Sequence, residues 1–353
     1  MLKKYLMGIS QCGIPIFLLA IILLTTSCEQ KNNRQITRGI YYWKTNVKIT
    51  EYEQERIDDL AVEEVYVKFF DVDIAADGKN ITPVAIVNFS ENIPKQDIIP
   101  VVFITPRALN TLDRATIEDF VENVASLIAH KAKDIDLDPQ EIQMDCDWTR
   151  SNKDLYFSFL RKLKNHPFFK DKILSVTIRL HQIKYAAESG IPPVDKGLLM
   201  VYNMESLTDI NIKNSIISTV VAKDYLTSVS QYPLPLDVAL PIFSWSLLFE
   251  KNQLLGILRE VSDKDINGNK SLYLLEDNLY KVTENTTLKN YDLKKDQIIR
   301  FENSDIKVVQ QVAQFLSKEM KNDSMKVLLY HCDSLQLQNY TTYELDKIYT
   351  HFH

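Results

Sequence analysis

The sequence predicts an α/β fold, specifically a (β/α)8 or TIM barrel with insertions after its second and seventh strands. Eight short apolar runs are spaced along the chain, and helical patterns lie between most neighbouring runs. Strands that alternate with helices form a parallel sheet, and eight such units close into a barrel. The 353 residues are 45% hydrophobic, which is enough apolar mass for one large domain of this kind.

The predicted elements follow directly from these patterns. The expected strands are residues 39–43, 65–72, 99–105, 142–148, 174–181, 197–203, 238–245 and 327–332. The expected helices are residues 51–61, 115–133, 153–164, 214–228, 305–319 and 342–352.

Two connections are too long for a minimal barrel. Residues 74–98 contain the strand-like run PVAIVNF, which we expect to form a hairpin over the top of the barrel. Residues 247–304 contain LLGILREV and SLYLLED, which predict a small insertion after the seventh strand. Long connections in compact domains are usually functional, so both should frame the C-terminal face, where barrel enzymes keep their chemistry.

The N-terminal residues have the features of a secretion signal. Lys3 and Lys4 form a basic start, and the apolar residues 14–24 are too few to span a bilayer comfortably. The stretch ends in LLTTSC, which resembles a bacterial lipobox. We therefore expect residues 1–27 to be a signal peptide and Cys28 to receive lipid. An uncleaved anchor helix is the alternative, but the small polar residues before Cys28 end the apolar run abruptly.

The lipobox also predicts where the protein resides. Residues 28–38 would form a flexible tether, and residues 39–353 the barrel. The expected location is the bacterial cell envelope, with the membrane reached through the lipid on Cys28. Glu29, rather than aspartate, follows Cys28 and argues against retention at the inner membrane. The outer membrane is therefore expected, on its periplasmic face or at the cell surface.

Composition excludes several classes of function. The formal net charge of −6 disfavours nucleic-acid binding, which requires a basic face. No glycine-rich phosphate loop is present among the 8 glycines, so no nucleotide cofactor is expected. The 6 histidines are scattered without metal-ligand spacing, and no G-x-S-x-G elbow indicates a serine hydrolase. Cys146 and Cys332 are expected as buried free thiols, although a disulfide is possible in an oxidising envelope.

The fourth and fifth predicted strands place polar side chains on their inward faces. These are Gln143, Asp145, Asp147, Ser175, Thr177, Arg179 and His181. Buried charges must be paired, so Lys68, Asp145 and Arg179 could equally form a structural ion network. Asp147 and His181 lie at C-terminal strand ends, which favours a site in the barrel mouth.

Other strand ends carry aromatic and polar groups as well. They are Tyr42, Trp43, Asp71, Asp73, Tyr202, Asn203, Glu205, Trp245, His331 and Asp333. Aromatic faces stack on sugar rings while polar groups bind hydroxyls, although any single aromatic residue is more often core. The combination predicts a cleft for a glycan or another polyhydroxylated ligand. The predicted contacts are Tyr42, Asp71, His181, Asn203, Glu205 and Trp245.

Two of these strands resemble a known family. IQMDCDWT resembles the fourth strand of glycoside hydrolase family 18, with its D-x-D-x-E motif, and GLLMVYNM resembles the sixth strand. Asp145 and Asp147 match the motif aspartates, Tyr202 the tyrosine and Asn203 the next position. The chain is also similar, from IQMDCDW to LPLDVALPIFSW, to uncharacterised barrel lipoproteins of Gram-negative envelopes.

The resemblance implies the catalytic mechanism of the family and also the loss of the acid that the mechanism needs. In the family, the glutamate protonates the leaving oxygen, and the adjacent aspartate orients the acetamido nucleophile of the substrate. Asp147, Asp145 and Tyr202 are then the catalytic candidates. Thr149 occupies the glutamate position, and its hydroxyl cannot be a general acid near neutral pH.

The leading hypothesis is therefore a glycan-binding envelope lipoprotein without the family's hydrolysis. Two alternatives remain open. One is an active glycosidase with its acid moved to Asp147, Asp71 or Glu205. The other is a docking subunit of an envelope assembly.

Overall fold

The computed structural model describes residues 34–90 and 92–353. The expected signal peptide, the lipidation residue Cys28 and most of the expected tether lie outside these residues. No helix within the described ranges is long and apolar enough to cross a membrane.

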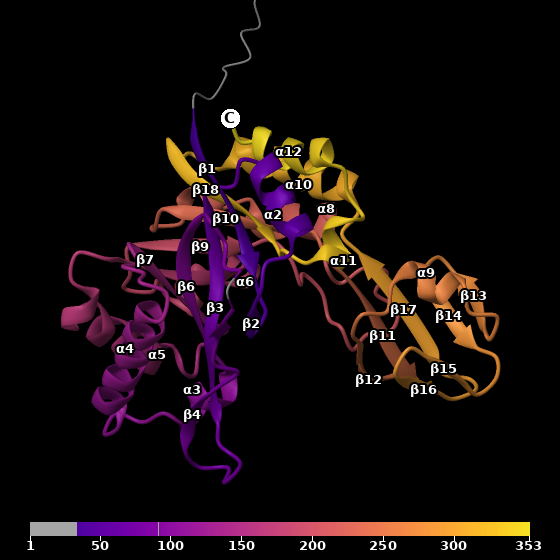
Figure 1. The fold of residues 1–353 in the computed structure, drawn as a ribbon, viewed down its shortest axis with the longest axis horizontal. Helices are drawn as coiled ribbons and strands as arrows, with labels where there is room; N and C mark the ends of the chain where they lie inside the picture. The colour runs from indigo at the N-terminus through magenta and orange to yellow at the C-terminus, as the bar shows by residue number, and fades with distance from the viewer. Residues whose placement is uncertain (1–33, 91) are drawn as a thin grey trace, which may run out of the picture. The chain divides into compact units, whose positions relative to one another are not determined.

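Eight parallel strands close into a barrel, which confirms the predicted fold class (Figure 1). The barrel strands are β1 (Gln35–Tyr42), β3 (Glu64–Ile74), β6 (Asp97–Ile104), β7 (Glu141–Cys146), β8 (Ile173–Arg179), β9 (Lys196–Met200), β10 (Leu236–Pro241) and β18 (Ser324–Tyr330). Closure is direct, because β1 pairs with both β3 and β18.

The helices cover the barrel at the predicted places. The longer ones are α2 (Glu51–Asp59), α4 (Ile117–Lys133), α5 (Lys153–Lys164), α8 (Thr219–Leu226), α10 (Ile306–Glu319) and α12 (Thr342–Thr350). Short helices are α3 (Pro106–Thr111), α6 (Leu180–Lys184), α7 (Ala186–Ser189) and α11 (Ser334–Leu337). Local chemistry fixes their starts. Thr50 and Glu53 form a reciprocal cap on α2, and Asp305 caps α10.

The first insertion follows β3 and is strand-like, as its sequence predicted. Strand β4 (Ile81–Val84) pairs antiparallel with the end of β3, and β5 (Asn88–Phe89) pairs with β2 (Asn46–Val47). The register between β3 and β6 shifts between Lys68 and Phe70, which marks a β-bulge. The bulge changes which β3 side chains face the barrel interior.

The second insertion follows β10 and has its own sheet, drawn in orange in Figure 1. Its antiparallel strands are β12 (Gln253–Leu258), β11 (Ser244–Glu250), β17 (Ile298–Asn303), β14 (Leu279–Val282) and β13 (Leu272–Glu276), in that spatial order. Helix α9 (Asp263–Asn267) and the hairpin of β15 (Thr286–Leu288) and β16 (Tyr291–Leu293) complete it. A separate apolar cluster that includes Leu248, Val282 and Ile299 forms its core.

Charged side chains fill the N-terminal end of the barrel. The Lys326 ammonium lies 2.8 Å from the Glu141 carboxylate and 2.7 Å from that of Glu64. Lys196 pairs with Asp237 on the neighbouring strand. Burial would raise the pKa of Glu141, but the lysines hold it below its ordinary value. Burial raises the pKa of Asp237 to about 6, because Lys196 offsets only part of that cost.

The expected boundary at residue 39 is wrong by several residues. Strand β1 begins at Gln35, so residues 35–38 belong to the barrel and not to the tether. Arg34 fixes this start, because its guanidinium donates to the backbone oxygens of Met320, at 2.5 Å, and Asn322, at 2.7 Å. These contacts satisfy carbonyl groups at the C-terminal end of α10.

The ion network at the N-terminal end of the barrel predicts a large loss of stability when one of its cations is removed. Lys326→Met should destabilise the protein by about 3–5 kcal/mol, because it removes the closer of the two lysines that compensate the buried Glu141 and leaves only Lys196, 3.9 Å away. Urea unfolding would measure this cost. The control is Lys95→Met, whose exposed pair with Asp58 should be worth less than about 1 kcal/mol. Equal losses of unfolding free energy in the two variants would contradict the stabilising role of this ion network.

Candidate functional site

A cavity of about 160 Å³ lies at the C-terminal ends of the barrel strands. We call it the mouth cavity. Its lining residues come from six of the eight barrel strands and the turns that follow them. They are Tyr41, Trp43, Phe103, Asp145, Thr177, Arg179, Met200, Tyr202, Asn203 and Tyr330.

Aromatic rings form one side of the mouth cavity. Tyr330, the last residue of β18, stacks on Tyr202 with the ring centroids 4.8 Å apart and the planes 22° apart. Tyr41 and Trp43 meet the Tyr330 ring at 5.5 and 6.0 Å. Such a cluster gives a rigid apolar surface of the kind on which sugar rings stack.

Two carboxylates near the mouth are paired with cations. Both oxygens of Asp147 accept hydrogen bonds from the Arg179 guanidinium, so the pair is bidentate. Lys68 lies 3.0 Å from Asp71. The β3 bulge makes this second pair possible, because simple strand alternation would place Lys68 and Asp71 on opposite faces.

Asp145 is in a different environment. Its carboxylate accepts a hydrogen bond from the Thr177 hydroxyl at 2.6 Å, and no cation in the described ranges forms an ion pair with it. Burial raises its pKa to about 6, and the neighbouring charge of Asp147 adds to the rise, while Arg179 partly opposes it. Asp145 is therefore a carboxyl that can exchange a proton near neutral pH.

The position of the motif glutamate holds no acid. Thr149 is exposed in the turn after β7, and its hydroxyl lies 2.8 Å from that of Ser151. Its backbone N–H donates to the Asn152 side chain at 2.7 Å. Thr149 thus takes part in the turn before α5 and offers no proton donor of suitable pKa.

The expected inward set is largely found inside the barrel. Gln143 accepts a hydrogen bond from the Tyr41 hydroxyl at 2.5 Å, and Ser175 donates to Glu141 at 2.6 Å. Trp148 lies on the outer side, where it stacks on Tyr156 of α5. Cys146 and Cys332 are separate buried thiols, as expected.

Two predicted ligand contacts are placed wrongly. Tyr42 is buried outside the barrel interior, where its hydroxyl donates to the Lys48 carbonyl at 3.1 Å; Tyr41 faces inward instead. His181 is exposed on α6, because β8 already ends at Arg179. The Gln182 side chain ends the strand by accepting from the Arg179 N–H and donating to the Trp148 carbonyl.

The other predicted contacts divide into two groups. Tyr202 and Asn203 line the mouth cavity, and Asn203 adopts a left-handed φ of 53°. Glu205 lies in the loop after β9 and does not line the cavity. Trp245 belongs to β11 of the insertion and not to the seventh barrel strand.

Trp245 lines a second, larger cleft of about 1120 Å³ between barrel residues and the insertion. Asn203 and Tyr330 line this cleft as well as the mouth cavity, so the two spaces are neighbours. Lys44, His331 and Asp333 line it from the barrel side. Within the described ranges, no three histidine, cysteine, aspartate or glutamate side chains are grouped as a metal site requires.

The sequence interpretation missed four lining residues. These are Tyr41, Phe103, Met200 and Tyr330, which lie inside apolar runs and so are interpreted as ordinary core. Only Tyr330 could have been found. Strand ends form the rim of a barrel, and β18 ends at Tyr330, but the apolar run in the sequence continues to Cys332 and places the end two residues too late.

No family model matches the chain, and no curated protein matches it. Solved structures do resemble it. The spore cortex-lytic enzyme SleL of Bacillus megaterium superposes with a TM-score of 0.54 at 12% identity, covering 90% of this chain and 74% of that one. A chitinase from Chromobacterium violaceum gives 0.53 at 11% identity, covering 88% of this chain and 98% of its own.

A class V chitinase from Nicotiana tobaccum in complex with NAG4 gives a TM-score of 0.53 at 10% identity, covering 90% and 99% of the two chains. At such identities the likeness concerns the fold. The resemblance to glycoside hydrolase family 18 is therefore confirmed for the barrel architecture.

The raised pKa of Asp145 predicts a pH-dependent stability. The folded pKa is about 6, above the unfolded value near 3.9, so this carboxyl lowers stability as pH rises between these values. Asp145→Asn removes the penalty and can still accept from Thr177. The variant should gain on the order of 2–3 kcal/mol over the wild type above pH 7 and almost nothing below pH 4.

Denaturant unfolding at pH 4, 5.5 and 7.5 would measure this difference. Because Asp237 titrates in the same range, the comparison of the two proteins isolates Asp145. A stability difference that does not change with pH would contradict the assignment.

Proposed function

We propose that the protein is a cell-envelope lipoprotein whose barrel mouth binds a glycan or related polyhydroxylated ligand without family-18 hydrolysis. The observation that carries this proposal is the mouth cavity, where aromatic rings surround Asp145, Thr177, Arg179 and Asn203. Thr149 stands where the motif places the acid. The residues that would hold a sugar are thus present, and the residue that would protonate its leaving group is not.

The arrangement can bind a sugar in two ways at once. The rings of Tyr330 and Trp43 offer apolar faces, while Arg179 and Asn203 offer hydrogen-bond donors to hydroxyl or acetamido oxygens. The larger cleft shares Asn203 and Tyr330 with the mouth and is also lined by Trp245, so a ligand longer than one sugar unit could contact both spaces. Because a structural neighbour was solved with NAG4, this tetramer is the first probe to test.

One observation favours an active glycosidase as the second candidate. Asp145 borders the mouth cavity and has a pKa near 6, which suits a general acid. The acids suggested by the sequence suit that role less well. Asp147 and Asp71 are paired with cations, and Glu205 lies away from the cavity. If the protein hydrolyses a glycan, we expect Asp145 to carry the proton.

The envelope location is part of the proposal. It is supported by the basic residues, the short apolar stretch and the LLTTSC sequence that precedes residue 29. A lipid on Cys28 would hold the barrel at the membrane without a spanning helix.

The mouth predicts which substitutions weaken glycan binding. Tyr330→Ala should weaken binding of NAG4 about tenfold, because it removes the ring that contacts Tyr41, Trp43 and Tyr202 in the aromatic cluster. The measurement is calorimetric titration of the chain from residue 29 onward with NAG4 and with a panel of other labelled oligosaccharides. Tyr343→Ala is the matched control, since Tyr343 is exposed on α12 away from the mouth.

The same samples separate the candidate functions. Retention of an intact oligosaccharide supports binding, and release of shorter products that stops in Asp145→Asn supports the glycosidase. If none of the panel is retained or cleaved, the mouth is not a glycan site and a docking role in an envelope assembly becomes the better account.

Lipidation can be tested on the same protein produced in a bacterial host. Intact-mass spectrometry of the wild type should show a chain that begins at Cys28 and carries a diacylglycerol with an added acyl group. Cys28→Ala should keep its signal peptide and lose the lipid mass. A wild-type chain cleaved elsewhere, or unmodified at Cys28, would refute the lipoprotein proposal.

A further inference from the structure

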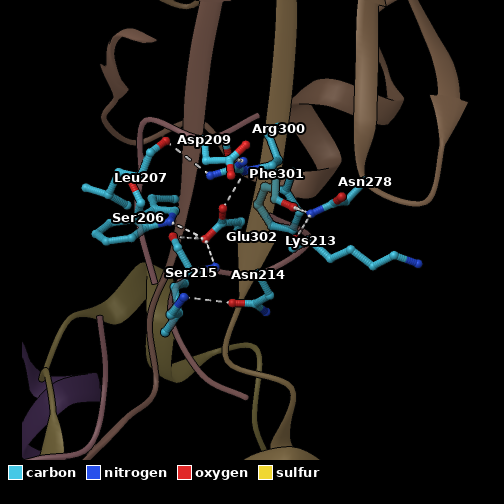
Figure 2. Close-up of polar contacts among 12 residues, drawn as sticks. Ser206, Leu207, Asp209, Lys213, Asn214, Ser215, Asn278, Arg300, Phe301 and Glu302 are labelled. Atoms are coloured by element: carbon cyan, nitrogen blue, oxygen red, sulfur yellow. Dashed lines mark hydrogen bonds and ion pairs between the residues drawn. The ribbon is translucent and has the colours of Figure 1, made fainter. Parts of the chain in front are cut away.

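A buried ion pair fixes the insertion against the loop that follows β9 (Figure 2). The Arg300 Nε lies 2.6 Å from Glu302 Oε1, and both side chains are fully buried. Arg300 also donates to the backbone oxygens of Asp209, at 2.5 Å, and Leu207, at 3.3 Å. A single strand, β17, thus supplies both charges, and the loop supplies the remaining acceptors.

Glu302 accepts hydrogen bonds from two other segments of the chain. Its Oε2 accepts from the Ser215 backbone N–H at 2.8 Å and from the Ser215 hydroxyl at 2.6 Å. The Trp245 indole N–H donates to the same oxygen at 2.9 Å. Hydrogen bonds to a buried carboxylate are among the stronger ones in proteins, and losing one leaves a buried oxygen without a donor, which lowers stability.

The chain of contacts continues to the mouth. The Ser215 carbonyl accepts from the Met204 N–H at 2.8 Å, and Met204 directly follows Asn203. Asn203, in its left-handed conformation, lines both the mouth cavity and the larger cleft. We call this contiguous series the Glu302 relay: Trp245, Glu302, Ser215, Met204 and Asn203.

Further contacts hold the same loop to the insertion. The Asn278 side chain donates to the Lys213 carbonyl at 2.7 Å (Figure 2). The Asn214 side chain donates to the Asn303 carbonyl at 2.8 Å. These bonds hold the two residues directly before Ser215 and so keep Ser215 beside Glu302. The loop is therefore held by the insertion rather than by the barrel alone.

We propose that the Glu302 relay makes Trp245 a positioning residue for Asn203, so that the wall of the larger cleft and the mouth cavity form one preformed binding surface. The relay itself is a property of the chain without ligand. Its effect on ligand binding rests on the proposed function. Because coupling between two sites is reciprocal, a ligand on the indole and one touching Asn203 would each change the affinity of the other by the same factor.

Trp245→Phe tests the relay, because it removes the indole N–H and keeps an aromatic ring in the cleft. Hydrogen exchange of the full mature chain, without ligand, should become about tenfold faster in residues 204–217, since a charge-assisted hydrogen bond is lost. Ser215→Ala removes the second side-chain donor to Glu302 and should show the same local change. Trp43→Phe is the control, because Trp43 lines the mouth without contacting the relay.

The pattern of exchange decides the proposal. Faster exchange confined to residues 204–217 and β17, with β6 to β8 unchanged, supports it. Unchanged exchange in that loop, or an increase spread equally over the barrel strands, overturns it.

A second measurement adds the ligand. In NAG4 titrations, the effects of Trp245→Phe and Asn203→Ala should be non-additive, because both act through one relay. Additive effects would overturn the link to binding. If NAG4 does not bind at all, the proposed function fails, and the exchange experiment still decides the relay.

Discussion

Charge compensation between strands is the constraint on which this structure depends. The interior of a closed barrel contains little water, so each charge that a strand turns inward must be met by an opposite charge or a hydrogen-bonding partner. At the base, Lys326 and Lys196 meet Glu141, Glu64 and Asp237. At the mouth, Arg179 meets Asp147 and Lys68 meets Asp71. The arrangement at the base joins β18 to β3 and β7, which are far apart in the sequence, so the barrel must be closed before those charges are satisfied. The pairs at the mouth are more local, because Lys68 and Asp71 share β3 and Arg179 and Asp147 come from neighbouring segments.

This constraint also gives Asp145 its character. The nearby cations are engaged by Asp147 and Asp71. Burial therefore raises the pKa of Asp145, the charge of Asp147 adds to the rise, and Arg179 and the hydrogen bond from Thr177 offset only part of it. The mouth therefore joins a rigid aromatic surface to a carboxyl that can hold a proton near neutral pH. The barrel resembles chitinases in its fold, and Thr149 stands where the sequence resemblance places the family's glutamate.

The sequence predicted the strands and helices well, because periodicity is local and each element shows it on its own. It could not decide which side of β1 faces inward, since Tyr41 and Tyr42 offer the same residue type on both faces. The hydrogen bond from Tyr41 to Gln143 shows that the odd positions of β1 face the interior. The β3 bulge has no sequence signal, yet it brings Asp71 to Lys68.

His181 was misplaced because a single side chain, Gln182, ends its strand early. The Glu302 relay draws on three distant segments and so leaves no local pattern at all.

The most direct measurement of the central claim is a carbon-13 NMR titration of the aspartate carboxyls in the mature chain, with Asp145→Asn used to assign one resonance. The account predicts that the resonance lost in the variant titrates near pH 6. A midpoint for Asp145 near the ordinary value of about 4 would show that its charge is compensated after all, and the description of the mouth would be wrong.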